Sequence, residues 1–363
     1  MEEKIISKHK GLSYSIVSDM RNYFEDSLFS TYPFLNTLCI KEFYEKENTD
    51  KHTYGLVAGV TEVINTNKEN SFENGMHNDK NGFPSFLRIS KSELKSNKIN
   101  IINNFSDNTK GILLNHSEEK INLPIIQRQV NKISAHENKY RVRPIESGIA
   151  IGNPIYSFSG TLGGICTLKG QEGYYLISNW HVLVGLNGEL NNPIIQPNSD
   201  LDGSSRNNQD NIAKLVWYRL DKYMDVALAK INDSISIKDM ENTKTAKIVP
   251  AKIGMEVFKS NFKSYKKGKI INTNCTVRVD GNSYPNKYVI LRNLIISEKI
   301  SSPSDSGSIV KDLKSEQVVG IIIGGDNKKF SVINPLDFTM PITPTNCRNY
   351  DYSLENIEIE EFI

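Results

Sequence analysis

A histidine, an aspartate and a serine in the second half of the chain have the residue types that nucleophilic catalysis requires. Five of the six histidines lie before residue 140 in polar, loop-like sequence, whereas His181 follows the β-type run 174–178 in an apolar setting. A ring placed in this way can be held in one orientation, as a general base must be. Asp225 directly precedes the apolar run 226–229, and a carboxylate buried there needs a partner such as an imidazole N–H.

The third group is a serine in the sequence Asp-Ser-Gly-Ser at 305–308, which runs straight into another apolar strand. A serine nucleophile needs a sharp turn that exposes its hydroxyl and directs backbone N–H groups at the developing oxyanion. The hydroxyl of Ser306 is weak without a base, and His181 could supply one. Cys275 paired with His181 is a conceivable cysteine nucleophile, but the residues around Cys275 look like a strand interior.

The order of the three groups along the chain restricts the possible folds. Ser-His-Asp triads occur in three unrelated chain orders. No histidine follows His181, and the region before it offers no aspartate comparable to Asp225. Only the order histidine, aspartate, serine remains, which is the order of the chymotrypsin-like enzymes.

Short strands are expected to position these residues. From about residue 141 to 344, short β-type runs alternate with polar turns, which predicts an antiparallel barrel or sandwich. The part before residue 146 is less regular, with a possible helix at 14–29 and strand-like runs at 35–40, 54–60, 86–89 and 99–102. Residues 349–363 carry five carboxylates, and we expect a solvated acidic tail there rather than a docked helix.

Several sequence blocks follow one another in a recognisable order. They lie at 143–152, 160–164, 176–183, 195–197, 225–227, 253–260, 305–308 and 318–335. With these blocks the region from about 141 to 336 resembles the trypsin-like (chymotrypsin-fold) serine peptidases. It resembles especially the intracellular bacterial and plant subgroup that carries an extra N-terminal domain. The resemblance implies two β-barrels with a catalytic cleft between them.

The resemblance also implies a role for each residue of the triad. Ser306 would attack the scissile carbonyl, His181 would accept its proton, and Asp225 would orient the imidazole. The backbone N–H groups of Ser304 and Ser306 would form the oxyanion hole. Ser304 departs from the family, which usually has glycine there because the position takes a backbone angle that is costly for other residues. Trp180 is also bulkier than the residue that usually precedes the histidine.

Family geometry implies a specificity pocket, for the residue before the cut, between 300–303 and 321–325. The residues expected to line it are Ile300, Ser301, Ile322 and Gly324. No aspartate stands at the base of this pocket, where Ile300 falls, so we expect a small or apolar side chain there rather than lysine or arginine. A nearby cluster of lysines could bind anions, but we expect these residues to lie on a solvated hairpin. They are Lys263, Lys266, Lys267 and Lys269.

Composition argues against other classes of protein. Lys plus Arg number 44 and Asp plus Glu 42, so the formal net charge of +2 argues against a nucleic-acid-binding protein. The apolar run 318–323 is too short to span a bilayer, and no secretory signal is recognisable, so we expect a cytoplasmic protein without a membrane partner. The four cysteines are scattered, so we expect no metal site, no disulfide framework and no cofactor.

The sequence therefore predicts a mainly β protein, a chymotrypsin-like double β-barrel preceded by a smaller α+β domain. We expect an accessory N-terminal domain at 1–145, a peptidase domain at 146–345 with a barrel boundary near 245, and an acidic tail at 346–363. The expected function is a serine endopeptidase that acts on protein or peptide substrates through an acyl-enzyme, with the N-terminal domain recognising substrates or a partner protein. The alternative is a catalytically impaired pseudo-protease that binds proteins with the same fold.

Overall fold

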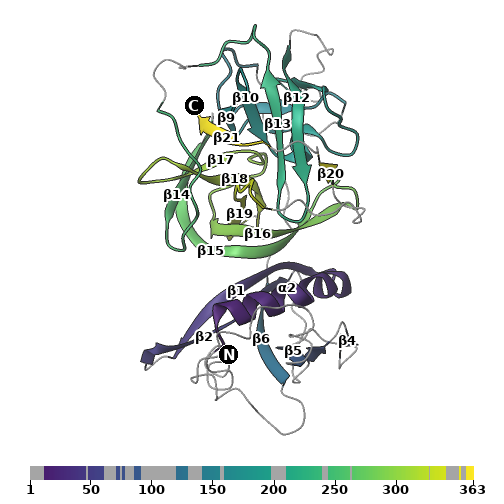
Figure 1. The fold of residues 1–363 in the computed structure, drawn as a ribbon, viewed down its shortest axis with the longest axis vertical. Coiled ribbons are helices and arrows are strands. Elements are labelled where there is room, and N and C mark those ends of the chain that lie inside the picture. Colours follow the sequence, from purple (N-terminus) through teal and green to yellow (C-terminus); the bar gives the residue numbers. More distant parts are fainter. Residues whose placement is uncertain are drawn as a thin grey trace. The chain divides into compact units, whose positions relative to one another are not determined.

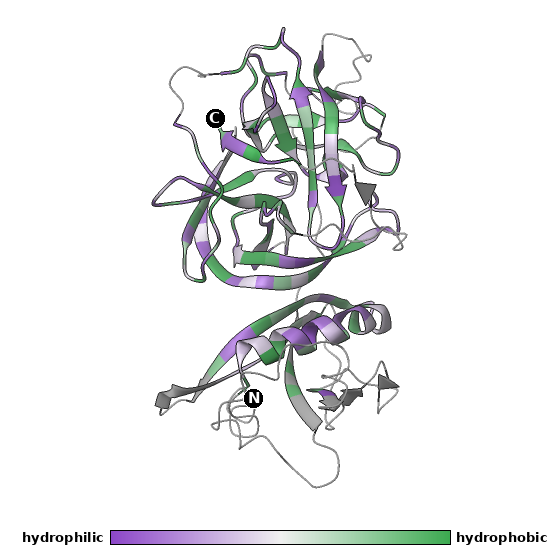
Figure 2. Ribbon diagram, in the orientation of Figure 1, coloured by the Kyte–Doolittle hydropathy of each residue, from purple (hydrophilic) through white to green (hydrophobic). Residues whose placement is uncertain are grey.

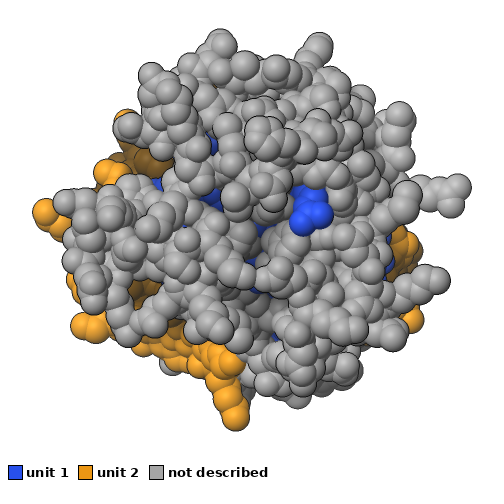
Figure 3. Space-filling view, turned by 90° about the horizontal axis from the view of Figure 1, so that it is seen from below, with its two compact units in different colours: residues 1–131, 275–278 blue, residues 132–274, 279–363 orange. Residues whose placement is uncertain are grey.

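The structure is a computed structural model. It describes residues 12–45, 48–60, 71–73, 76–77, 86–90, 120–129, 141–155, 159–197, 210–238, 244–261, 264–326, 328–340, 351–352 and 357–363. The chain divides into two compact units, residues 1–131 with 275–278 and residues 132–274 with 279–363, which Figure 3 shows in separate colours. Among the described residues, no helix has both the length and the apolar character that a membrane crossing requires.

The first unit combines a helix with a small sheet (Figure 1). Helix α2 (Tyr14–Thr31) begins at Ser13, whose side chain accepts a hydrogen bond from the backbone N–H of Ile16 and so satisfies one free N–H of the first turn. Its buried residues recur every three or four positions, which gives the helix one apolar face, and it packs against β1 and β2. The strands, in sheet order, are β1 (Leu35–Glu45), β2 (Asn48–Val60), β6 (Lys120–Gln129), β5 (Phe86–Ser90), β3 (Ser71–Glu73) and β4 (Met76–His77). The helix and strands expected at 14–29, 35–40, 54–60 and 86–89 are present, and the strand expected at 99–102 lies outside the described residues.

The second unit begins with a curled antiparallel sheet. In sheet order its strands are β9 (Gly164–Leu168), β10 (Tyr175–Ser178), β13 (Asp225–Ile231), β12 (Asn211–Leu220), β11 (Pro193–Ile195), β7 (Ala150–Gly152) and β8 (Ser159–Thr161). Only Leu162 and Gly163 separate β8 from β9, so the two ends of this sheet belong to one bent segment of chain. The sheet is therefore curled into an open barrel, in which β21 (Ile359–Phe362) pairs along the outer edge of β9.

A second barrel follows in the same unit. Its strands, in sheet order, are β14 (Glu256–Asn261), β17 (Ile309–Asp312), β18 (Val318–Gly325), β19 (Phe330–Asn334), β16 (Tyr288–Glu298) and β15 (Ser264–Asp280). Strand β14 pairs with both β17 and β15, and this double pairing closes the barrel. Its interior is filled by Val257, Ile270, Ile295, Ile300, Val310, Val319, Ile322 and Ile333.

An apolar cluster joins the two barrels within this unit. Side chains of β9, β10 and β13, such as Leu168, Ile177 and Leu228, pack in one cluster with Ile309 and Ile321 of the second barrel. Apolar residues recur along the strands that meet here (green in Figure 2). The barrels are thus held against each other by a shared core, which fixes the groups that each contributes to the space between them.

The C-terminal residues differ from the expected solvated tail. Short strand β20 (Asp351–Tyr352) pairs with β12, and β21 (Ile359–Phe362) pairs with β9. Phe362 is buried in the cluster between the barrels, and its backbone exchanges two hydrogen bonds with Ala246. The prediction of a solvated tail was wrong for these residues, because the apolar side chains of Ile359 and Phe362 outweigh the glutamates between them, which lie outside the core.

Replacing Phe362 with alanine is expected to lower the free energy of unfolding by about 3–5 kcal/mol, because a buried aromatic ring is lost and a cavity remains. Urea denaturation followed by circular dichroism measures this change. The matched control is Glu360→Ala, which removes an exposed side chain of the same strand and should leave the midpoint unchanged. Equal midpoints for the Phe362 variant and the wild type would show that β21 contributes nothing to the barrels.

Candidate active site

His181 and Asp225 form a tightly bonded pair at the junction of three elements. The short helix α4 (Trp180–Leu183) starts directly after β10, and Asp225 is the first residue of β13. The His181 Nδ1 atom lies 2.6 Å from Asp225 Oδ2, and the His181 backbone N–H donates to Oδ1 at 3.1 Å. A carboxylate accepts hydrogen bonds, so Nδ1 carries the proton and Nε2 is left as the acceptor. Nε2 has no hydrogen-bond partner in the described part of the chain.

The backbone of Asp225 is fixed from both barrels. Its N–H donates to Asn334 Oδ1 at 2.9 Å, and its carbonyl accepts a hydrogen bond from Asn179 Nδ2 at 2.8 Å. Asn334 belongs to β19 of the second barrel, and its amide also donates to the carbonyl of Tyr223 at 2.8 Å. The buried carboxylate therefore has a defined position relative to both barrels, which a group that orients a base requires.

Tyr284 is a member of this cluster that the sequence did not reveal. It lies in the connection between β15 and β16, and its hydroxyl donates to Asp225 Oδ2 at 2.6 Å and lies 3.0 Å from His181 Nδ1. Burial, reinforced by the charge of Asp225 and the hydrogen bond to it, raises the pKa of Tyr284 well above its ordinary value, so the hydroxyl keeps its proton. The bulky Trp180 stacks on the Tyr284 ring, with centroids 6.3 Å apart and planes at 8°. Trp180 thus supports the ring of Tyr284, whose hydroxyl contacts both His181 and Asp225.

Ser306 lies in a sharp turn that packs on the strands next to His181. Gly307 has a φ of 97°, and a Cβ at this position would overlap the carbonyl oxygen of Thr161 and the hydroxyl of Ser178. The carbonyl of Ser306 accepts a hydrogen bond from the Thr161 N–H at 2.8 Å. The Ser306 hydroxyl donates to the carbonyl of Ile323 at 2.8 Å, and no hydrogen bond among the described residues joins it to His181. The turn is therefore seated beside the pair, with its hydroxyl directed at β18.

The residue that departs from the family pattern, Ser304, adopts the expected left-handed backbone. Its φ is 75°, a conformation that costs roughly 1–3 kcal/mol for a residue other than glycine. The Thr161 hydroxyl donates to the Ser304 carbonyl at 2.7 Å and holds the peptide in this orientation. Within the described ranges, neither the Ser304 N–H nor the Ser306 N–H donates to any group. Both remain available to an oxygen anion.

Asp305, inside the same turn, is neutralised by a lysine from another strand. Lys259 of β14 is buried, and its Nζ lies 2.7 Å from Asp305 Oδ2. The same oxygen accepts the backbone N–H of Ser302 at 2.6 Å, while Lys259 also donates to the Ser264 hydroxyl at 3.0 Å. Burial lowers the pKa of Lys259, and the hydrogen bond and charge of Asp305 oppose that shift. The ion pair thus ties the turn to the wall of the second barrel.

The expected specificity pocket needs correction. The side chains of Ile300, just after β16, and Ile322, on β18, pack in the apolar core of the second barrel. Ser301 is buried beside Gly324, with its hydroxyl 3.3 Å from the Gly324 carbonyl. Ser331, which no sequence pattern marked, also lies at this position, and its hydroxyl is 2.8 Å from that of Ser301.

The alternative nucleophile Cys275 lies in the interior of β15, as its sequence context suggested. It is fully buried, and burial raises the pKa of its thiol well above the ordinary value. Reactive cysteines have a lowered pKa and some exposure, so this environment does not suit a nucleophile.

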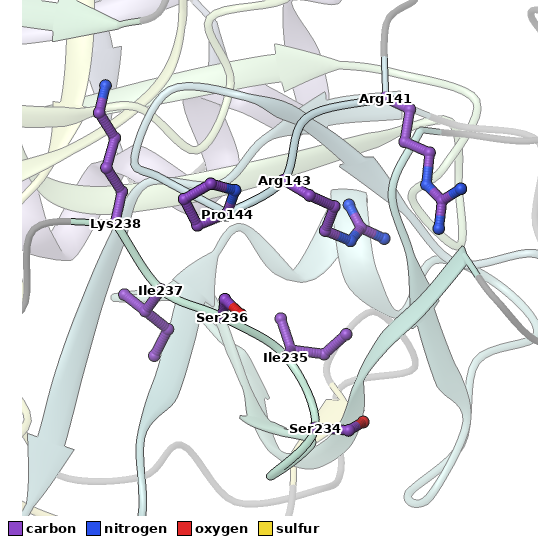
Figure 4. Close-up of a pocket in the computed structure, with 8 residues that line it drawn as sticks. All are labelled: Arg141, Arg143, Pro144, Ser234, Ile235, Ser236, Ile237 and Lys238. Atoms are coloured by element: carbon purple, nitrogen blue, oxygen red, sulfur yellow. The ribbon is translucent and has the colours of Figure 1, made fainter.

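A cavity of about 570 Å³ lies apart from these groups and is lined by none of them (Figure 4). Two arginines line one side of it and the segment 234–238 the other. Arg143 donates to Gln196 Oε1 at 2.6 Å, Arg141 is 3.4 Å from an Asp210 oxygen, and Lys238 is 2.8 Å from Glu146 Oε2. Each cation here already has an acceptor, and those of Arg143 are the neutral oxygens of Val142 and Gln196.

No family model and no curated protein matches the chain. Solved structures are similar to about half of it. Cellulomonas bogoriensis chymotrypsin is 17% identical, with 53% of this chain and 92% of that chain covered and a TM-score of 0.37. The Nocardiopsis protease NAPase (16% identity, 53% and 93% covered, TM-score 0.36) and Thermobifida fusca Protease A (15% identity, 53% and 92% covered, TM-score 0.36) are similar to the same extent. Each of these likenesses spans about half of this chain.

Proposed function

We propose that the protein is a serine endopeptidase that hydrolyses peptide bonds through Ser306, His181 and Asp225. The observation that carries the proposal is the attachment of His181 to both oxygens of one buried carboxylate, at 2.6 Å and 3.1 Å. This attachment selects the tautomer in which Nε2 is free to accept a proton, which a general base needs. The two unpaired N–H groups of Ser304 and Ser306 provide further support, because an oxyanion hole consists of such donors.

The reaction would begin when the Ser306 hydroxyl turns from the Ile323 carbonyl to His181 Nε2. Its proton moves to Nε2 as the Oγ–C bond to the substrate forms, and the carbonyl oxygen becomes an oxyanion held by the N–H groups of Ser304 and Ser306. Asp225 stabilises the imidazolium. The C–N bond then breaks, Nε2 returns the proton to the leaving amine, and water hydrolyses the acyl-enzyme by the same steps.

The second candidate is a catalytically impaired pseudo-protease that binds proteins with this fold. One observation favours it, because the Ser306 hydroxyl donates to Ile323 rather than to His181. Apo structures often show such unformed contacts, which tighten only when substrate binds, so this hydrogen bond alone does not decide between the two candidates.

The proposal also covers the role of the first unit and the location of the protein. We propose that the first unit is an accessory domain that recognises protein substrates or a partner protein. We propose a cytoplasmic location, which agrees with the free thiols of the three cysteines among the described residues, Cys39, Cys166 and Cys275, because thiols stay reduced in that compartment.

Labelling with a fluorophosphonate probe tests the proposed activity. The folded wild type should be labelled, Ser306→Ala should not be, and His181→Ala should lose labelling as strongly. Asp225→Asn should reduce the labelling rate by orders of magnitude, because the ring would lose its tautomer. Ser308→Ala is the matched control, since it removes a hydroxyl two residues away in the same turn. An unlabelled, folded wild type would favour the pseudo-protease, and labelling retained in Ser306→Ala would mean that another serine reacts.

Tyr284→Phe is expected to reduce the labelling rate by about tenfold, because the carboxylate of Asp225 loses the hydroxyl donor at 2.6 Å that helps to hold it against the His181 ring. The phenyl ring keeps its stacking on Trp180, so the fold should be unaffected. Tyr174→Phe, which removes a tyrosine hydroxyl just before β10, serves as the control. An unchanged labelling rate would show that Tyr284 is only a packing residue.

Lys259→Met is expected to reduce the labelling rate at least tenfold, because it leaves the carboxylate of Asp305 buried without its counter-ion. Breaking one side of a buried ion pair costs about 3–5 kcal/mol, whereas removing both charges is often nearly neutral. The double variant Lys259→Met, Asp305→Asn should therefore recover part of the labelling. Circular dichroism reports folding, and Lys267→Met, on an exposed position of β15, is the control. If the double variant is no better than the single one, the charge pair does not organise the turn.

A further inference from the structure

Two lysine side chains meet a group of serine hydroxyls beside the turn that carries Ser306. Lys299, which follows β16, donates to the backbone carbonyl of Asp326 at 2.5 Å, and its Nζ lies 3.4 Å from the Ser301 hydroxyl. Lys266 of β15 donates to the Ser302 hydroxyl at 2.6 Å. Lys267 and Lys269 on the same strand are exposed, as expected for a solvated hairpin, but Lys266 and Lys299 are partly buried.

Neither of these two ammonium groups is paired with a carboxylate in the described part of the chain. Burial lowers the pKa of Lys299, as does the neighbouring charge of Lys266, while the carboxylates of Asp326 and Asp305 oppose that shift. Asp305 is already bound to Lys259, and Asp326 Oδ1 accepts the N–H groups of residues 328 and 329. Partly desolvated cations normally have an anionic partner, so this site lacks one negative group.

The hydroxyls next to Lys299 have a defined direction. Ser331 Oγ accepts the N–H groups of Ile300 and Ser301, at 2.9 Å and 2.8 Å, so both of its lone pairs are used and its own proton goes to Ser301 Oγ. Ser301 must then direct its proton elsewhere, and its acceptor is the Gly324 carbonyl at the long distance of 3.3 Å. This O–H is therefore weakly bound and can be donated to an incoming anion.

The cluster of Lys266, Lys299 and the Ser301 hydroxyl is connected to Ser306 through two segments of the chain. Gly324 and Asp326 follow Ile323, whose carbonyl accepts the Ser306 hydroxyl. On the other side, the N–H of Ser302 donates to Asp305, the residue before Ser306. A side chain on the substrate residue that supplies the attacked carbonyl would therefore lie next to Lys299, Ser301 and Lys266.

We propose that the enzyme cleaves after acidic residues, and that Lys299, Lys266 and the Ser301 hydroxyl bind the Asp or Glu carboxylate. This inference rests on the proposed peptidase function and names its substrate class. It replaces the expectation of a small or apolar side chain, which depended on Ile300, a residue of the barrel core. A carboxylate would supply the missing negative charge and accept hydrogen bonds from two ammonium groups and a hydroxyl.

Fluorogenic peptides that differ only in the residue before the cut test this proposal. With Glu against Gln and Asp against Asn, shape is kept and only the charge changes. The wild type should prefer at least one acid over its amide by tenfold or more in kcat/KM, and added salt should reduce that ratio. Lys299→Met should bring the ratio below about threefold, and Lys266→Met should reduce it less. Lys267→Met should retain the wild-type ratio.

Binding to the Ser306→Ala variant separates this inference from the peptidase proposal. Calorimetry with product-like peptides that end in Glu or Gln needs no turnover, and the Glu peptide should bind at least tenfold more tightly. A wild type that reacts with the fluorophosphonate but cleaves after Gln as well as after Glu would overturn the acidic specificity alone. An unreactive wild type whose Ser306→Ala variant still prefers the Glu peptide would overturn the peptidase proposal and leave the acid-binding site. Equal binding of both peptides would overturn the site itself.

Discussion

A buried carboxylate must be surrounded by hydrogen-bond donors, and this constraint at Asp225 organises the candidate site. The donors come from the His181 ring, the His181 backbone and the Tyr284 hydroxyl. They belong to α4, next to the first barrel, and to a connection of the second barrel, so the carboxylate is satisfied only when the barrels pack together. The amide of Asn334 adds a bond from β19 to the backbone of the same residue. The geometry of the proposed base is therefore a property of the whole two-barrel unit.

A second buried carboxylate, Asp305, is satisfied in a different way. Asp225 is bound by neutral donors and keeps its charge for the imidazole, whereas Asp305 is neutralised by the ammonium group of Lys259. The first arrangement leaves a negative charge that can stabilise a cation during reaction, and the second gives a rigid turn with little net charge. The two aspartates of the site thus differ in the net charge that they contribute, because their partners differ.

The sequence predicted the parts of the site that follow local patterns. His181 follows one apolar run, Asp225 directly precedes another and Ser306 lies in a glycine turn, so type, context and chain order were enough to select them. Tyr284 and Lys259 could not be found in this way, because one sits in a polar turn and the other in an alternating strand, and their partners are distant in sequence. Ile322 was assigned to a pocket because residue order does not say which face of a strand a side chain takes, and a shift of one residue reverses it. Ile300 was assigned there from its position after β16, which does not show that its side chain turns into the barrel. The tail was misjudged because its charges were counted and its apolar residues, Ile359 and Phe362, were not.

The position of Lys259 also bears on the order in which the chain can fold. Lys259 lies on β14, the strand that closes the second barrel by pairing with β15 and β17. Until that strand is in place, Asp305 lacks the ammonium group of Lys259, and burial of its carboxylate with the turn around Ser306 is less favourable. A chain that is only partly folded therefore carries no organised hydroxyl at this turn. Closure of the barrel and assembly of the proposed nucleophile are therefore coupled, so a partly folded chain would lack the proposed activity.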